Sequence, residues 1–226
     1  MNLSSSRDVR DIAPQPPGIV PTLRARKQQL VRDTIWKAAT DLFAQKGFDE
    51  TTVDDIALAA GISRRSFFRY FASKSDIMAH GMLLYGVELI QVINACPKNY
   101  SLPEVFRRTV LQVARQAASQ PRTRKIMEIV AKYPAARTAE VSRLPEVLDL
   151  LAKAYTRRCN SKSRDSLAPS ILSGLTLQVL AVAFHSWFED GERDISSVAE
   201  QVLATLGRLI CDDKQPSRQK GQKRLE

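Results

Sequence analysis

The sequence has few of the residues that build covalent or metal frameworks. Its 226 residues include three cysteines and two histidines. Cys96, Cys159 and Cys211 are odd in number and lie far apart, so they predict neither a disulfide framework nor a zinc site. Reduced thiols are typical of the cytoplasm. We therefore expect a cytoplasmic protein that holds no metal and no cofactor.

The sequence also lacks an export signal and the motifs of common enzymes. Residues 1–20 contain charges and prolines, where a secretory signal needs an unbroken apolar stretch. No glycine-rich phosphate loop, HExxH or GxSxG motif occurs. Residues 171–188 carry no charge and are long enough for a membrane span, but five of these eighteen residues are polar. A helix buried between subunits has the same profile, and we favour that interpretation.

The residues that are present predict an all-α fold. Apolar side chains from Ile35 to Phe43 follow a helical period, and Gly47 ends that helix. Further helices are expected at residues 74–95, 102–119, 121–132, 139–159, 166–190 and 196–211. Residues 1–22 are rich in Ser and Pro and residues 212–226 are polar and basic, so we expect a disordered leader and a disordered tail.

Between the first helix and residue 74, two short helices are predicted close together. Thr52 offers an N-cap, and Gly61 interrupts the apolar run that follows. Ser63 then supplies a new N-cap two residues later. Three helices joined in this way form a helix-turn-helix unit, whose last helix enters the DNA major groove. We assign residues 23–73 to this domain and residues 74–211 to a second, helical domain.

The last helix of this unit has two different sides. Phe67 and Phe71 lie four residues apart and are expected in a small core. The opposite side presents Arg64, Arg65 and Phe68. Arginine can bind guanine O6 and N7 with two hydrogen bonds, and an exposed aromatic ring can cover a thymine methyl group. The net charge of +10 adds long-range attraction to an anionic partner.

The run GISRRSFFRYFASKSDI, from residue 61, resembles the DNA-binding signature of the TetR family of bacterial repressors. The preceding runs TTVDDIALAA and AATDLFAQKGFD resemble it too, so the similarity covers residues 26–77. Many family members have a small residue or proline where Arg65 stands. The resemblance implies a regulator that binds an operator in double-stranded DNA as a homodimer and is not an enzyme. We expect a repressor that a small-molecule effector releases from a palindromic operator.

The resemblance also implies roles for single residues. Arg64, Arg65 and Phe68 would face base edges, and Gly61 and Ser63 would form the turn and the cap. The residues implied to hold DNA phosphates are Thr52, Ser66, Tyr70 and Lys74. Two alternatives stay open: Tyr70 can equally be a packing residue, and Arg69 is better explained as solvated than as base-reading.

In TetR-like proteins the helical C-terminal part binds a ligand and dimerises through its last two long helices. The apolar side chains expected at this homodimer interface are Leu172, Leu175, Val179, Val182, Phe188, Val198, Val202 and Leu206. A two-fold dimer would place two recognition helices in successive major grooves, which is why a palindromic operator is expected.

The segment from Cys96 to Arg164 is strongly basic, with fifteen Lys and Arg against five Asp and Glu. One hypothesis is a pocket mouth for an amphipathic anion, for example an acyl-coenzyme A thioester. Its cations would be Arg107, Arg108, Arg115, Arg122, Arg124 and Lys125. The simpler alternative is a solvated basic surface that attracts DNA. A helical enzyme that acts on thioesters and a membrane-associated helical protein are the other classes to be tested.

Overall fold

The computed structural model describes residues 22–159, 167–190 and 193–211. These residues form helices and no strands, so the predicted all-α fold is confirmed. The first five helices are α2 (Leu23–Lys46), α3 (Val53–Ala59), α4 (Arg64–Tyr70), α5 (Lys74–Ala95) and α6 (Leu102–Ala118). They are followed by α7 (Pro121–Lys132), α8 (Pro134–Val141), α9 (Leu144–Thr156), α10 (Ala168–Asp190) and α11 (Ile195–Cys211). The predicted tail and all of the predicted leader except Thr22, which caps α2, lie outside the described residues.

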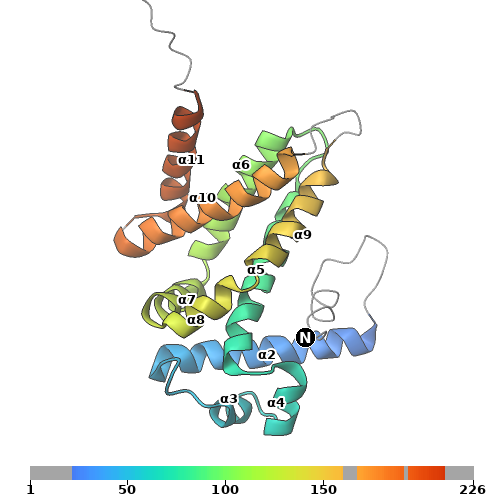
Figure 1. Ribbon diagram of the computed structural model, residues 1–226, viewed down its shortest axis with the longest axis vertical. Helices are drawn as coiled ribbons and strands as arrows, with labels where there is room; N and C mark the ends of the chain where they lie inside the picture. Colours follow the sequence, from blue (N-terminus) through green and yellow to red (C-terminus); the bar gives the residue numbers. More distant parts are fainter. Residues whose placement is uncertain (1–21, 160–166, 191–192, 212–226) are drawn as a thin grey trace, which may run out of the picture.

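The helix α2 separates two parts of the molecule (Figure 1). The short helices α3 and α4 lie on one side of α2, and α7 and α8 lie on the other. The long helix α5 starts beside α4 and runs from there toward α6, α9 and α10. This course makes α5 the element that connects the helix-turn-helix to the C-terminal helices.

Two hydrophobic cores share α5. The first core is built on buried side chains of α2, α3 and α4 and includes Ile77 and Met78 from the start of α5. Ile129 of α7 and Ala136 of α8 complete it. The second core takes the later part of α5, from Leu83 onward, together with α6, α9, α10 and α11. A displacement of α5 would therefore affect both cores, since interiors are close-packed.

The single helix predicted at residues 139–159 is wrong, because the structure has two helices there. α8 ends at Val141, and α9 begins at Leu144. Pro145 lies in the first turn of α9, where its missing N–H costs nothing. In the interior of one long helix, the proline ring would clash with the carbonyl four residues earlier. The break at residues 142–143 is the result.

Part of the predicted dimer interface belongs instead to the core of one protomer. Val179 is 4% exposed and Val198 is 2% exposed, so both are corrected to core residues. The reason is that α10 packs against α9, α6 and α11, and that α11 packs against α6 as well. Leu172, Leu175, Val202 and Leu206 are partly buried against this core and Phe188 is also partly buried, whereas Val182 is 40% exposed. The most exposed apolar side chains of the two helices are Ile171, Leu209 and Ile210.

Two described helices, α5 and α10, are long and apolar enough to cross a membrane by length and composition alone. Core helices of soluble proteins have the same property. Most of the apolar window of α5 is buried inside the protein. These helices are therefore weak evidence for a membrane protein.

Candidate nucleic-acid interface

The start of α3 is fixed by a reciprocal pair of hydrogen bonds. Thr52 Oγ1 accepts from the amide of Asp55 at 3.1 Å, and the Asp55 carboxylate accepts from the Thr52 amide at 2.8 Å. Lys46 Nζ lies 2.6 Å from the same carboxylate. The hydrogen bonds from Lys46 and then from Thr52 hold the pKa of Asp55 well below its usual range. The capping box fixes the start of α3, and the ion pair between Lys46 and Asp55 ties it to the end of α2.

The turn between α3 and α4 depends on one glycine and one serine. Gly61 has a φ of 67°, a conformation that only glycine adopts without strain. The amide of Ile62 then donates to the Ala57 carbonyl at 2.9 Å, which closes the end of α3. Ser63 Oγ accepts from the Ser66 amide at 3.1 Å and so caps α4. α4 therefore leaves α3 at a defined angle.

The inner side of α4 is anchored by aromatic rings. Phe67 is completely buried, and its ring lies 6.1 Å from that of Phe71 and 5.4 Å from that of Phe68. Phe71 in turn contacts His80 of α5, with ring centroids 5.3 Å apart. These contacts hold the back of α4 against the first core, so the outer side faces solvent.

The outer side of α4 carries Arg64, Arg65 and Phe68, all of which are exposed. Arg64 Nη1 lies 2.7 Å from Asp54 Oδ2, and its guanidinium lies 5.7 Å from the Phe68 ring centroid. The Arg64 and Asp54 side chains are both more than 60% exposed, so this ion pair is weak and the guanidinium can exchange it for another partner. Phe68 is 47% exposed. Two guanidinium groups and an aromatic ring on one short helix suit contacts with base edges.

The residues predicted to hold phosphates differ from one another in exposure and in hydrogen-bond partners. Thr52 is exposed, but its hydroxyl already serves the capping box. Ser66 is half-buried, and its hydroxyl accepts from Ser63 Oγ at 3.0 Å. Tyr70 packs partly against the first core, and the Arg69 guanidinium lies 5.0 Å from its ring centroid. The phenol oxygen also accepts from Arg69 Nη2 at 3.3 Å.

Lys74 has contacts that the sequence did not predict. Its Nζ donates to the carbonyl oxygens of Phe48 at 2.7 Å, Asp49 at 2.8 Å and Thr51 at 3.3 Å. It also lies 4.8 Å from the Phe48 ring centroid. An ammonium group has three protons, and these carbonyls use all of them. Lys74 therefore forms a clamp between α5 and the loop that follows α2, and its contact with a phosphate stays a prediction.

Leu58 was missed by the sequence reasoning. It lies on α3 and is 83% exposed, the largest exposure among the large apolar residues described. Its position in the sequence indicates this exposure. Leu58 follows the exposed Asp54 by four residues and so lies on the same side of the helix. The helices α3 and α4 thus present two exposed large apolar side chains, Leu58 and Phe68.

The six cations predicted at a pocket mouth contact different neighbours. Arg107, Arg108 and Arg115 are exposed on α6. The other contacts are Arg108 with Tyr100 at 5.9 Å, Arg122 with Trp36 at 5.0 Å, Arg124 with Trp187 at 5.4 Å and Lys125 with Asp41 at 3.9 Å. In the described part of the chain no group of three His, Cys, Asp or Glu side chains is placed to hold a metal ion.

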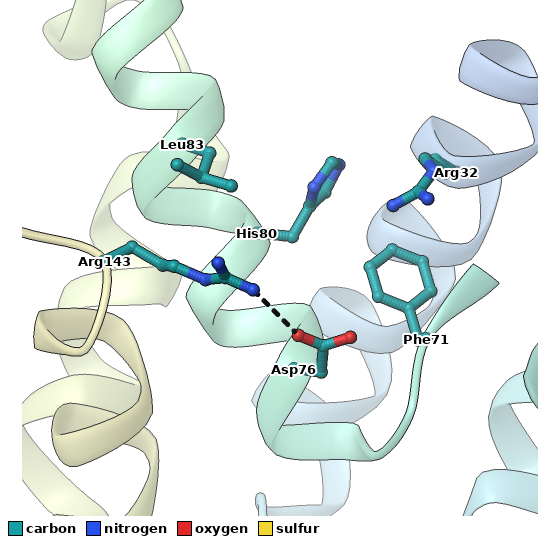
Figure 2. A pocket seen from close by; sticks show the side chains of 6 residues that line it. All are labelled: Arg32, Phe71, Asp76, His80, Leu83 and Arg143. Atoms are coloured by element: carbon teal, nitrogen blue, oxygen red, sulfur yellow. Dashed lines mark ion pairs between the residues drawn. The ribbon is translucent and has the colours of Figure 1, made fainter. Parts of the chain in front are cut away.

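A small cavity lies where α2, α5 and the start of α9 meet (Figure 2). Its volume is about 10 Å³, roughly the space of one water molecule. Arg143 Nη2 lies 3.8 Å from Asp76 Oδ1 across it. The lining side chains are Arg32, Phe71, Asp76, His80, Leu83 and Arg143. This junction is too tight for an organic ligand, and it joins the helix-turn-helix to α5 by direct packing.

Comparisons with known proteins agree with this geometry. Residues 35–80 match the family model of bacterial regulatory proteins of the tetR family, and residues 100–210 match the model of the MftR C-terminal domain. The chain belongs to the TetR family. It is therefore a transcriptional regulator with a DNA-binding helix-turn-helix, and the predicted family is confirmed.

Individual members of the TetR family are distant from this chain. The mycofactocin biosynthesis transcriptional regulator MftR of Mycobacterium tuberculosis is 29% identical over 183 residues, which cover 80% of this chain and 92% of MftR. A TetR-family structure from Syntrophomonas wolfei is 20% identical with a TM-score of 0.59, covering 80% of this chain and 95% of that one. The Thermus thermophilus repressor FadR in complex with lauroyl-CoA is 23% identical, with a TM-score of 0.53 and coverage of 84% and 100%. These two structures show the shared fold.

Proposed function

We propose that this protein is a cytoplasmic, homodimeric repressor that binds a palindromic operator and leaves it when a small-molecule effector binds. One observation supports the DNA-binding part of this proposal. Phe67, completely buried, fixes α4 from behind, while Arg64, Arg65 and Phe68 stand exposed on its outer side. Family membership supports transcriptional regulation, and the likeness to the Thermus thermophilus repressor FadR supports the direction of control.

In this proposal the two arginines of α4 read base edges and Phe68 covers a thymine methyl group or a sugar. The hydroxyl groups of Thr52, Ser66 and Tyr70 contact phosphates, as do free amides at the helix N-termini. Phosphate contacts position α4 in the groove, and the arginines supply the preference for sequence. Lys74 supports this surface from behind.

Dimerisation is proposed to use the outer sides of α10 and α11. These helices expose Ile171, Val182, Leu209 and Ile210, which are 57%, 40%, 73% and 65% accessible in the protomer. Apolar side chains on two neighbouring helices are suited to a four-helix bundle with a second copy. A two-fold axis through that bundle would present two copies of α4 to successive major grooves.

The effector is proposed to be an amphipathic anion, with acyl-coenzyme A thioesters as the first candidates. The basic excess between Cys96 and Arg164 and the lauroyl-CoA in the Thermus thermophilus structure support this class. Isothermal titration with long-chain acyl-coenzyme A tests it. We expect saturable heat and recovery of the intact thioester, because the proposal contains no catalytic step. Absence of heat at saturating concentrations would remove these thioesters from consideration.

The DNA-binding part is tested by selecting bound fragments from random or genomic DNA and then measuring affinity for the selected site. Arg64→Ala and Arg65→Ala should each weaken specific binding by about 1 to 3 kcal/mol for a true bidentate contact. Arg69→Ala is the matched control, because Arg69 lies on the same helix and is stacked on Tyr70. Unchanged affinity in both test variants, or a monomer that binds every duplex equally, would contradict the proposal.

A further inference from the structure

A groove of about 320 Å³ lies at the junction of α2, α5 and α7. Its lining side chains are Asp33, Thr34, Trp36, Lys37, Leu84 and Arg122. Small-molecule sites in proteins have volumes of roughly 300 to 1,000 Å³. This groove is at the lower end of that range, so it suits a small ligand and not a whole acyl-coenzyme A molecule.

Arg122 is the lining residue of this groove that has an unsatisfied hydrogen-bond donor. Its guanidinium lies 5.0 Å from the ring centroid of Trp36, yet its Nε is buried and has no hydrogen-bond partner. A buried donor without a partner is destabilising, and more so when the group is charged. Among the described residues no carboxylate forms an ion pair with Arg122 or with Lys37 on the opposite wall. The groove therefore holds two cations without an ion-pair partner, together with the carboxylate of Asp33.

The apolar wall of the groove is held in one position. A methyl group added at Gly81 of α5 would lie 3.1 Å from Trp36 Nε1, so the glycine lets the indole lie close against the α5 backbone. Arg122 stacks on the same indole, and Leu84, one turn along α5 from Gly81, extends the apolar wall. A flat hydrophobic surface thus adjoins the unpaired guanidinium.

We propose that this groove binds a small monocarboxylate with a planar, apolar body. The carboxylate would accept from the two Nη groups of Arg122, because the buried Nε presents no surface to the groove, and guanidinium groups favour such bidentate pairing. Trp36 and Leu84 would cover the body of the ligand, and Lys37 would add a second positive charge. Asp33, which accepts from Gln29 Nε2 at 2.8 Å, places a negative charge on the same wall. That charge disfavours ligands with several anionic groups.

The location gives such a ligand a route to the DNA-binding helices. In Figure 1, α2 lies between α7 and the pair α3 and α4. A carboxylate held by Arg122 of α7 and Lys37 of α2 would tie these two helices together and bias their relative position. This regulatory step rests on the proposed function, whereas binding in the groove does not.

Isothermal titration of the full-length protein with 2-naphthoate tests the binding step, and 2-naphthamide serves as the uncharged analogue. We expect naphthoate to bind, and both Arg122→Gln and the change to naphthamide to weaken binding by about tenfold or more, as loss of a charge-assisted pair predicts. Lys132→Gln is the matched control, because Lys132 lies on the same helix over Tyr133 and outside the groove. It should bind naphthoate like the unmodified protein. Circular dichroism will show that both variants keep their helices.

The outcomes separate this proposal from the proposed function, since the titration contains no DNA. The groove proposal is overturned if the unmodified protein shows no binding at ligand concentrations on the order of 10 mM, or if Arg122→Gln binds equally well. The regulatory step is measured separately, as the operator affinity with and without saturating naphthoate. We expect a change of about threefold or more, and an unchanged affinity would overturn that step while leaving the site intact.

Discussion

Replacing Lys74 by methionine tests whether this residue is a structural clamp or a DNA contact. The ammonium group joins the first turn of α5 to three carbonyl oxygens of the loop between α2 and α3. Phe48 and Thr51, whose carbonyls it satisfies, are each 1% exposed. Methionine keeps much of the length and the apolar stem but removes every donor, so those buried carbonyls would lose their partner.

The expected loss of stability follows from these contacts. A hydrogen bond from a charged group contributes about 1.5 to 3 kcal/mol, and a bond at 3.3 Å less than one at 2.7 Å. One half-buried ammonium shares its charge among three acceptors, so the contributions do not add in full. We expect a loss of about 2 to 4 kcal/mol, which corresponds to roughly 4 to 16 °C in melting temperature for a chain of this size.

The assay is thermal unfolding followed by circular dichroism, combined with operator affinity measured well below the melting temperature. Lys125→Met is the control, because Lys125 is exposed and its ion pair with Asp41 is 3.9 Å long, so its loss should cost less than about 1 kcal/mol. A melting temperature for Lys74→Met equal to that of the control would refute the clamp. Loss of DNA binding at unchanged stability would instead restore the phosphate contact.

Three further substitutions test the backbone at two glycines and the protonation of one buried carboxyl group. Gly47→Ala forces a non-glycine residue to a φ of 96° and brings its methyl group against Tyr133 Oη, so we expect a loss of about 2 to 4 kcal/mol in thermal unfolding. Gly61→Ala, at a φ of 67° with open space around it, should lose only about 1 to 2 kcal/mol, and an equal loss in both would exclude the Tyr133 contact. Burial raises the pKa of Glu140 although Arg137 opposes the shift, so the wild-type protein loses stability as the pH rises through that raised pKa. Glu140→Gln cannot ionise and should melt higher than the wild type at pH 7 and about equally at pH 4; a gap of the same size at both pH values would contradict this.

The helix-turn-helix could be predicted from the sequence because the interactions that define it are formed between residues close together in the chain. Thr52 and Ser63 cap helices within three residues of themselves, and Gly61 is required by its own backbone angle. Phe67 and Phe71 face inward because of a four-residue spacing. Each of these features depends on neighbours within one or two helical turns. Such neighbours can be identified from the sequence alone.

The contacts that the sequence did not predict depend on residues far away in the chain. Lys74 follows the helix-turn-helix and is positively charged, which fits a phosphate contact, but its partners lie 23 to 26 residues earlier. Val179 and Val198 belong to apolar stripes that suit either a subunit interface or a protomer core. The choice between these is made by the packing of α10 on α9 and α6, which helical periodicity does not encode.

The net charge of the basic segment between Cys96 and Arg164 does not predict which of its cations can bind an anion. Counting Lys and Arg treats the fifteen cations of this segment as equivalent. Their neighbours nevertheless differ from residue to residue. Lys153 pairs with Asp149 and Arg143 with Glu146, and such pairs are largely neutral toward an incoming anion. Arg122 instead has an indole on one side and a buried Nε without a partner. Affinity for an anion at close range depends on such an unpaired, partly desolvated donor more than on net charge, because surface charges are screened within about 10 Å.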